Sequence, residues 1–240
     1  MVVGLAARWT AGPQTSVVEF VSNGIAWPIV LAAAFLLLVV CVTGWSNIGF
    51  HRFKVLPTLK LMWLPMIYIA AFAGIAIALG LPAGRNLALI MLNTGFVGLS
   101  EELMFRGILF SGLRSRLGLQ SSIWICCILF GAIHVLNAFQ TGMIEAAMLQ
   151  AVAAFMTGTL FLALRMRTGS LFPVIVLHAV WDCLPLLIAT HVAPPTAGQP
   201  LPAMAYLAPL FVLPNLLYGL YLLRPKGLAK IPGLHKTQSG

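Results

Sequence analysis

The sequence predicts an all-α protein whose helices cross a membrane several times as a bundle. Of the 240 residues, 60% are apolar and only 8% are Asp, Glu, Lys or Arg, whereas charged residues make up about 25% of a soluble domain. The apolar residues form continuous runs of about 20 positions, the length that a helix needs to cross the hydrocarbon layer. Because the runs do not alternate between apolar and polar positions, they predict helices rather than the strands of a barrel. The composition excludes an ordinary soluble enzyme and a disordered chain.

Seven apolar segments are expected to span the membrane, within a range of six to eight because the third is long and the fourth short. The segments are Ile25–Trp45, Leu61–Leu81, Leu87–Leu113, Ser121–Leu136, Met143–Leu164, Leu171–Thr190 and Ala203–Leu223. They divide the chain into three parts. Residues 1–85 hold two transmembrane helices, residues 86–190 form a core domain, and residues 191–240 hold the last helix and a basic tail.

The positive charges are distributed unevenly between the two sets of loops. Eleven Lys and Arg residues follow the first, third and fifth segments or lie in the tail, and only Arg8 and Arg85 fall on the other side. The positive-inside rule therefore predicts a multi-pass protein of the cell membrane with its amino terminus outside and its carboxyl terminus in the cytoplasm. The net charge of +9 reflects this topology and contact with anionic lipid of the bilayer. The basic residues are scattered singly, which excludes a nucleic-acid partner.

Three of the five acidic residues fall inside predicted membrane segments. The third segment contains Glu101, Glu102 and Arg106, and an acidic residue at the bilayer centre costs about 2.5–3.5 kcal/mol. Glu102 and Arg106 are four residues apart, so they can form an ion pair along one helical face. Glu101 lies about 100° around the helix and is left outside that pair. A buried ion pair that orders the bundle explains Glu102 and Arg106, but it does not explain Glu101.

Two more segments carry ionisable groups, and all three sets lie at a similar depth. The fourth segment holds His134, four residues after Phe130, and the sixth holds His178 and Asp182, also four residues apart. At a rise of about 1.5 Å per residue, Glu101, His134 and His178 lie roughly 20, 21 and 17 Å from the basic ends of their segments. Taken singly, each group could be a structural polar residue that holds helices together. Their agreement in depth indicates a single intramembrane site.

These groups have the composition of a hydrolytic site. A carboxylate and an imidazole can share and deprotonate a water molecule, and a second imidazole beside a hydrogen-bonding partner can stabilise the oxyanion that forms. Alternatively, Glu101, His134 and His178 could hold a divalent metal such as zinc, with one position open for water. The sequence contains no HExxH motif, so a metal site would be assembled from three helices. From the residues alone, a metal cofactor and no cofactor both stay open.

The ordered motifs resemble those of the CPBP family, the CAAX-protease and bacteriocin-processing (Abi) intramembrane proteases, which are related to the type II CAAX prenyl endopeptidases. The family pattern is EExxxR, then FxxxH, then HxxxN or HxxxD. The three motifs stand here in that order as Glu101-Glu102-Leu-Met-Phe-Arg106, Phe130-Gly-Ala-Ile-His134 and His178-Ala-Val-Trp-Asp182. The surrounding domain would cover roughly Asn86–Thr190. The last motif ends in Asp182, where the prenyl-protease form has Asn.

The resemblance implies an endopeptidase that cuts a membrane-associated or lipidated protein or peptide, either by a glutamate-dependent mechanism or as a metalloprotease. It implies Glu101 as the base that activates water together with His134. The glutamate–arginine pair would position that helix, and His178 and Asp182 would bind the oxyanion or complete the polar cluster. Two other functions stay open: a non-catalytic scaffold or immunity protein of the same fold, and a transporter or proton relay.

Overall fold

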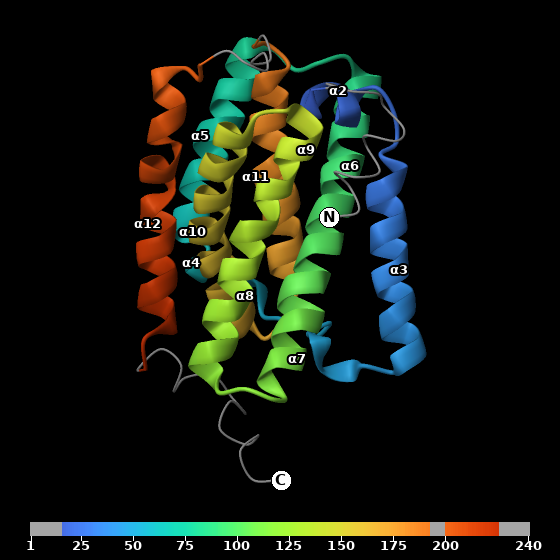
Figure 1. Ribbon diagram of the computed structural model, residues 1–240, viewed down its shortest axis with the longest axis vertical. Coiled ribbons are helices and arrows are strands. Elements are labelled where there is room, and N and C mark those ends of the chain that lie inside the picture. The colour runs from blue at the N-terminus through green and yellow to red at the C-terminus, as the bar shows by residue number, and fades with distance from the viewer. Residues whose placement is uncertain (1–15, 193–199, 226–240) are drawn as a thin grey trace.

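The computed structural model describes residues 16–192 and 200–225, and every regular element in these ranges is a helix. The long helices run up and down along the longest axis, and successive ones alternate in direction (Figure 1). The elements are α2 (Val17–Ser22), α3 (Trp27–Thr43), η1 (Ser46–Ile48), α4 (Val55–Leu61), α5 (Trp63–Leu79), α6 (Gly84–Glu102), η2 (Leu103–Leu109), α7 (Phe110–Arg114), α8 (Leu119–Ile133), η3 (His134–Asn137), α9 (Ala138–Thr141), α10 (Ile144–Thr168), α11 (Phe172–Ala189), η4 (Ala203–Leu207) and α12 (Ala208–Leu223). The predicted all-α bundle is confirmed.

Five helices of the described residues are long and apolar enough to cross a membrane, and the bent pair α4–α5 makes six if it is counted as one span. The five are Gly84–Arg114, Leu119–Asn137, Ile144–Thr168, Phe172–Ala189 and Ala203–Leu223. The first predicted segment forms α3, which has only 17 residues because Gly44 ends it in the left-handed conformation with φ 63°. The number of spans is therefore five to six by length and composition, against the seven predicted segments.

The second predicted segment begins at a sharp break. α4 and α5 meet at Met62, and their axes differ by 76°. The hydroxyl of Tyr218 on α12 donates a hydrogen bond of 3.0 Å to the carbonyl oxygen of Leu61 at this break. Because a helix end leaves carbonyl groups without intrahelical partners, α12 satisfies part of the interrupted backbone.

α10 is the central helix, and it packs against α8 on one side and α12 on the other. Its residues 157–164 are all buried. Two glycines let the neighbours approach its backbone. A methyl group on Gly219 of α12 would lie 2.9 Å from the amide nitrogen of Leu160, and one on Gly131 of α8 would lie 2.8 Å from the carbonyl oxygen of Ala151. The backbone of α10 therefore lies close to the backbones of both α8 and α12.

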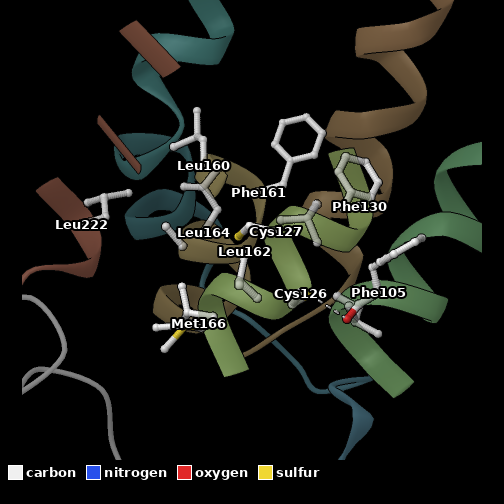
Figure 2. Packing of buried hydrophobic residues seen from close by; sticks show 14 of the residues in the cluster. Phe105, Cys126, Cys127, Phe130, Leu160, Phe161, Leu162, Leu164, Met166 and Leu222 are labelled. Carbon is white, nitrogen blue, oxygen red and sulfur yellow. Dashed lines mark hydrogen bonds between the residues drawn. The ribbon is translucent and has the colours of Figure 1, made fainter. Parts of the chain in front are cut away.

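The main apolar cluster fills the space between α8, α10 and the segment that follows α6 (Figure 2). Cys126 on α8 donates a hydrogen bond from Sγ to the carbonyl oxygen of Phe105, at 3.2 Å. The rings of Phe130 and Phe161 lie at the margin of this cluster. Phe130 contacts the Arg106 guanidinium, and Phe161 contacts the His178 ring.

A close crossing of α6 and α11 brings two of the predicted motifs together. Gly98 of α6 faces α11, where a methyl group on its Cα would lie 2.8 Å from the carbonyl oxygen of Ile175 and 2.9 Å from the amide nitrogen of Ala179. Because glycine allows the two backbones to approach so closely, the residues that follow Gly98 meet those around Ala179. Glu102 and His178 are placed in this way.

The basic loops lie at one end of the bundle. Because the long helices alternate in direction, the described basic residues of the loops predicted to be cytoplasmic fall toward the end of the bundle that holds α7, whereas Arg85, at the start of α6, lies toward the opposite end (Figure 1). Those residues are Arg52, Lys54, Lys60, Arg114, Arg116, Arg165, Arg167 and Arg224. The sidedness of the two ends in the membrane stays a prediction.

Candidate active site

Glu102 and Arg106 form the ion pair that their spacing predicts. Nη1 of Arg106 donates to Oε1 of Glu102 at 2.9 Å, and both side chains are fully buried. Burying either charged side chain alone would cost free energy because the charge loses its hydration, and the ion pair offsets part of this cost for both residues.

Aromatic and backbone groups from α8 and α10 enclose the guanidinium. The Cζ atom of Arg106 lies 3.8 Å from the centroid of the Phe130 ring and 6.0 Å from that of Phe161. Nη2 donates a hydrogen bond of 3.0 Å to the carbonyl oxygen of Gly158. Cation–π contacts are stronger where water is excluded. The positive charge of Arg106 is therefore held by contacts to two further helices.

The imidazole of His178 lies among three carboxylates. Nδ1 is 2.7 Å from Oε1 of Glu102, whereas Nε2 is 3.4 Å from Oδ2 of Asp182 and 3.8 Å from Oε2 of Glu101. An ionised carboxylate can only accept hydrogen bonds, so both ring nitrogens of His178 face acceptors. A ring with protons on both nitrogens satisfies this arrangement.

The site has a buried floor and an accessible edge. The side chains of Glu101 and Asp182 are 32% and 34% exposed, whereas those of Glu102 and Arg106 are not exposed at all. Oε2 of Glu101 is itself covered and accepts no hydrogen bond from any residue that the structure describes. A reactant can therefore approach the cluster only from the edge that Glu101 and Asp182 form.

His134 joins the site through an aromatic ring. It begins η3 at the end of α8, and its Nδ1 lies 2.8 Å from the carbonyl oxygen of Phe130, which can only accept. Nδ1 therefore carries a proton, and in the neutral ring Nε2 carries the lone pair. The Phe130 ring meets His134 edge-on at 5.1 Å and His178 edge-on at 6.0 Å. Within residues 16–192 and 200–225, His134 makes no hydrogen bond or ion pair with the carboxylates.

The structure thus connects five of the six predicted residues directly and the sixth through Phe130. Three features of the site were missed from sequence. A π-helix, η2, follows Glu102 immediately and carries Arg106, and π-helical turns occur frequently at functional sites. The other two are Phe161, whose ring centroid lies 5.4 Å from that of His178, and Gly158. Both lie on α10, which carries no ionisable residue near the site, and the glycine inside this helix was the only signal in the sequence.

The predicted metal ligands are not arranged as a metal site. Among the residues that the structure describes, no group of three or more His, Cys, Asp or Glu side chains could hold a metal ion. The Nδ1 contacts of His178 with Glu102 and of His134 with the Phe130 carbonyl leave the Nε2 atom of each ring available as a ligand. It is the spacing of Glu101, His134 and His178 that does not fit a metal ion in this arrangement.

An apolar cavity of about 1120 Å³ is lined by α5, α10, α11, η4 and α12 together with Val192 and residues 200–202. Trp181 and Pro185 of α11 form part of its wall. The ring of Trp181 packs edge-on against Phe161 at 6.3 Å, and Phe161 in turn contacts the His178 ring. The rings of Trp181 and Phe161 therefore connect the wall of the cavity to the imidazole.

Comparison with known proteins supports the family that the motifs indicated. Residues 82–184 match the family model described as type II CAAX prenyl endopeptidase Rce1-like. No curated protein and no solved structure matches the chain. The matched range contains all three motifs and therefore every residue of the charged cluster. Over residues 82–184 the chain is thus similar to the type II CAAX prenyl endopeptidases described as Rce1-like.

Proposed function

We propose that this chain is an intramembrane endopeptidase of the CPBP type in which Glu101 activates a water molecule for attack on a peptide bond. The observation that carries this proposal is the position of the Glu101 carboxylate at the accessible edge of a buried charge network. Its side chain is 32% exposed, and its Oε2 lies 3.8 Å from Nε2 of His178 without a hydrogen-bond donor among the described residues. A general base must reach the attacking water and be free to accept its proton. Glu102 is less suited, because its side chain is fully buried and Arg106 and His178 already share its Oε1.

In the proposed reaction, Glu101 takes a proton from water as the water oxygen bonds to the carbonyl carbon of the scissile peptide. The carbonyl electron pair moves onto its oxygen, which becomes an oxyanion. The carbon–nitrogen bond then breaks as the carbonyl re-forms, and the amine leaves with the proton that Glu101 held. The products are a carboxylic acid and an amine, and Glu101 is ionised again.

The two histidines have different proposed roles. Nε2 of His178 faces the accessible edge beside Glu101 and Asp182, so an N–H at this position can stabilise the oxyanion. Nε2 of His134 carries a lone pair in the neutral ring and can accept a hydrogen bond from the attacking water. Asp182 would hold the Nε2 proton of His178 toward the edge. No step of this mechanism passes through a metal ion.

We further propose that the substrate is a membrane-associated or lipidated protein or peptide and that its apolar part lies in the cavity beside the site. The cavity is lined almost entirely by apolar side chains, and its wall residue Trp181 contacts Phe161, which in turn contacts the His178 ring. The prenyl group in the name of the matched family is one apolar chain of this kind. An apolar anchor held there would leave the adjoining peptide near Glu101.

Filling the cavity is expected to weaken the binding of lipidated substrate. Ala153 on α10 lines the cavity, and Ala153→Trp should raise the KM for a farnesylated peptide by about tenfold or more. The KM for the same peptide without the lipid should change less than twofold. The control is Val152→Trp on the same helix, because Val152 is 44% exposed on the outside of the bundle. Equal KM values for Ala153→Trp and wild type in steady-state assays would contradict this placement.

The proposed activity is tested with the purified chain in liposomes and an internally quenched, farnesylated peptide. We expect cleavage, and we expect His134→Ala to slow it by about 100-fold or more. Zinc bound at one ion per active chain, with activity lost on chelation, would favour the metalloprotease mechanism instead. A chain that carries protons down a pH gradient and cleaves no peptide would be a transporter or relay.

A further inference from the structure

We propose that Gly158 on α10 is a positioning residue for the reaction: it holds the Arg106 guanidinium against Glu102, and through Glu102 it sets the position of His178. The inference rests on the proposed function, and its test separates the two. α10 contributes no ionisable side chain to the site. Its contribution is a carbonyl group and the absence of a side chain.

Gly158 contacts the guanidinium in two ways. Its carbonyl oxygen accepts the 3.0 Å hydrogen bond from Nη2 of Arg106. Its Cα lies so close that a methyl group there would be 2.8 Å from Nη2 and 2.5 Å from Cδ1 of Phe130. Real Cβ atoms essentially never approach other heavy atoms within 3.0 Å. An alanine at this position must therefore displace Arg106, Phe130 or α10 itself.

Displacement of Arg106 would reach His178 through a single carboxylate oxygen. Oε1 of Glu102 accepts from Nη1 of Arg106 at 2.9 Å and lies 2.7 Å from Nδ1 of His178. All three side chains are buried, so water cannot replace a lost contact without entering the core. If the guanidinium moves, the Glu102 carboxylate must either move with it or lose the hydrogen bond from Nη1. Either change alters the contact between Oε1 of Glu102 and Nδ1 of His178.

The presence of a glycine at position 158 is explained by its contacts with Arg106 and Phe130 and not by a requirement of the helix backbone. Glycine weakens a helix relative to alanine, and Gly158 lies in the middle of α10 without a positive φ. Its neighbours Thr157 and Thr159 are buried and carry side chains. The position therefore tolerates burial but has no room for a Cβ on the side that faces Arg106.

The test is a comparison of Gly158→Ala with Gly219→Ala in steady-state cleavage assays of the liposome-embedded chain. A methyl group on Gly219 would also lie within 3.0 Å of α10, at the amide nitrogen of Leu160, but its three nearest atoms are backbone atoms of Thr159 and Leu160 and none belongs to the charged cluster. We expect Gly158→Ala to lower kcat about 100-fold with KM changed less than threefold. Gly219→Ala should change kcat less than threefold. Equal losses in the two variants would assign Gly158 a merely structural role.

A double-mutant cycle tests the contact itself. Arg106→Lys removes Nη2, so Gly158→Ala should lower kcat by less than tenfold in that background, against about 100-fold in the wild type. Multiplicative effects of the two substitutions would overturn the inference. The same four proteins are compared in reversible unfolding, which does not depend on activity. If the wild type cleaves no peptide, the proposed function fails, and additive changes in the free energy of unfolding then overturn the contact as well.

Discussion

Glu101→Gln is expected to lower the rate of peptide cleavage by about 100- to 10,000-fold. Glutamine has nearly the same shape as glutamate, but its amide cannot take a proton from water. Oε2 of Glu101 has no hydrogen-bond partner within residues 16–192 and 200–225, and the side chain is one-third exposed, so the fold loses little. The variant should therefore insert and unfold like the wild type while its cleavage rate falls.

Glu145→Gln is the matched control for this loss. Glu145 lies in the first turn of α10 and accepts a hydrogen bond of 2.7 Å from the hydroxyl of Tyr206, away from the cluster. Its replacement removes one acidic charge from the same chain, and cleavage should stay within about twofold of the wild type. Wild-type activity in Glu101→Gln would rule out Glu101 as the base, and a fall in both variants would indicate a general effect of charge.

Arg106→Met is expected to reduce the free energy of unfolding by about 3–5 kcal/mol, because it leaves the buried carboxylate of Glu102 without its charged partner. Met matches the length of the Arg stem and can pack against the Phe130 ring. Reversible unfolding in mixed detergent micelles measures the change. Cleavage should also be lost, since Glu102 supports His178 through the 2.7 Å contact.

A second substitution distinguishes loss of the ion pair from loss of packing. Glu102→Gln removes the unpaired charge and keeps an oxygen that can accept from Nδ1 of His178. The double variant Arg106→Met with Glu102→Gln should therefore be more stable than Arg106→Met alone, while cleavage stays impaired. If the double variant is no more stable than Arg106→Met, packing of the guanidinium against Phe130 explains the loss rather than the charge.

The features that follow a local period could be predicted from the sequence. Long apolar runs gave the bundle, and the four-residue spacings gave the Glu102–Arg106 and His178–Asp182 contacts, at 2.9 and 3.4 Å. Such pairs depend on the rise and turn of one helix. The equal depth of the motifs also indicated a single site, although His134 reaches it only through Phe130.

The features that depend on contacts between helices could not be predicted in this way. The pairing of Glu102 with His178 depends on the crossing at Gly98, and the enclosure of Arg106 depends on Gly158. Neither glycine is part of a periodic signal, because what matters is the neighbouring atom that fills the space. The break at Met62 and the π-helix that carries Arg106 likewise leave no apolar or polar pattern. A count of apolar segments therefore gives seven spans, whereas five to six helices of the described residues are long and apolar enough to cross a membrane.

The charged cluster contains both buried and partly exposed side chains. Glu102, Arg106 and His178 are buried and mutually bonded, whereas Glu101 and Asp182 remain partly exposed. Buried pairs fix geometry at a cost in desolvation, and an exposed carboxylate can exchange a proton with water. We infer that the buried pair serves to hold His178 beside Glu101, which performs the proton transfer.

Mass spectrometry of a farnesylated peptide incubated with the liposome-embedded chain shows directly whether Glu101 drives hydrolysis of a peptide bond. We expect two fragments whose masses sum to that of the peptide plus one water with wild type and Glu145→Gln, and intact peptide with Glu101→Gln. An intact peptide with wild type, or the same fragments with Glu101→Gln at the wild-type rate, would contradict this expectation.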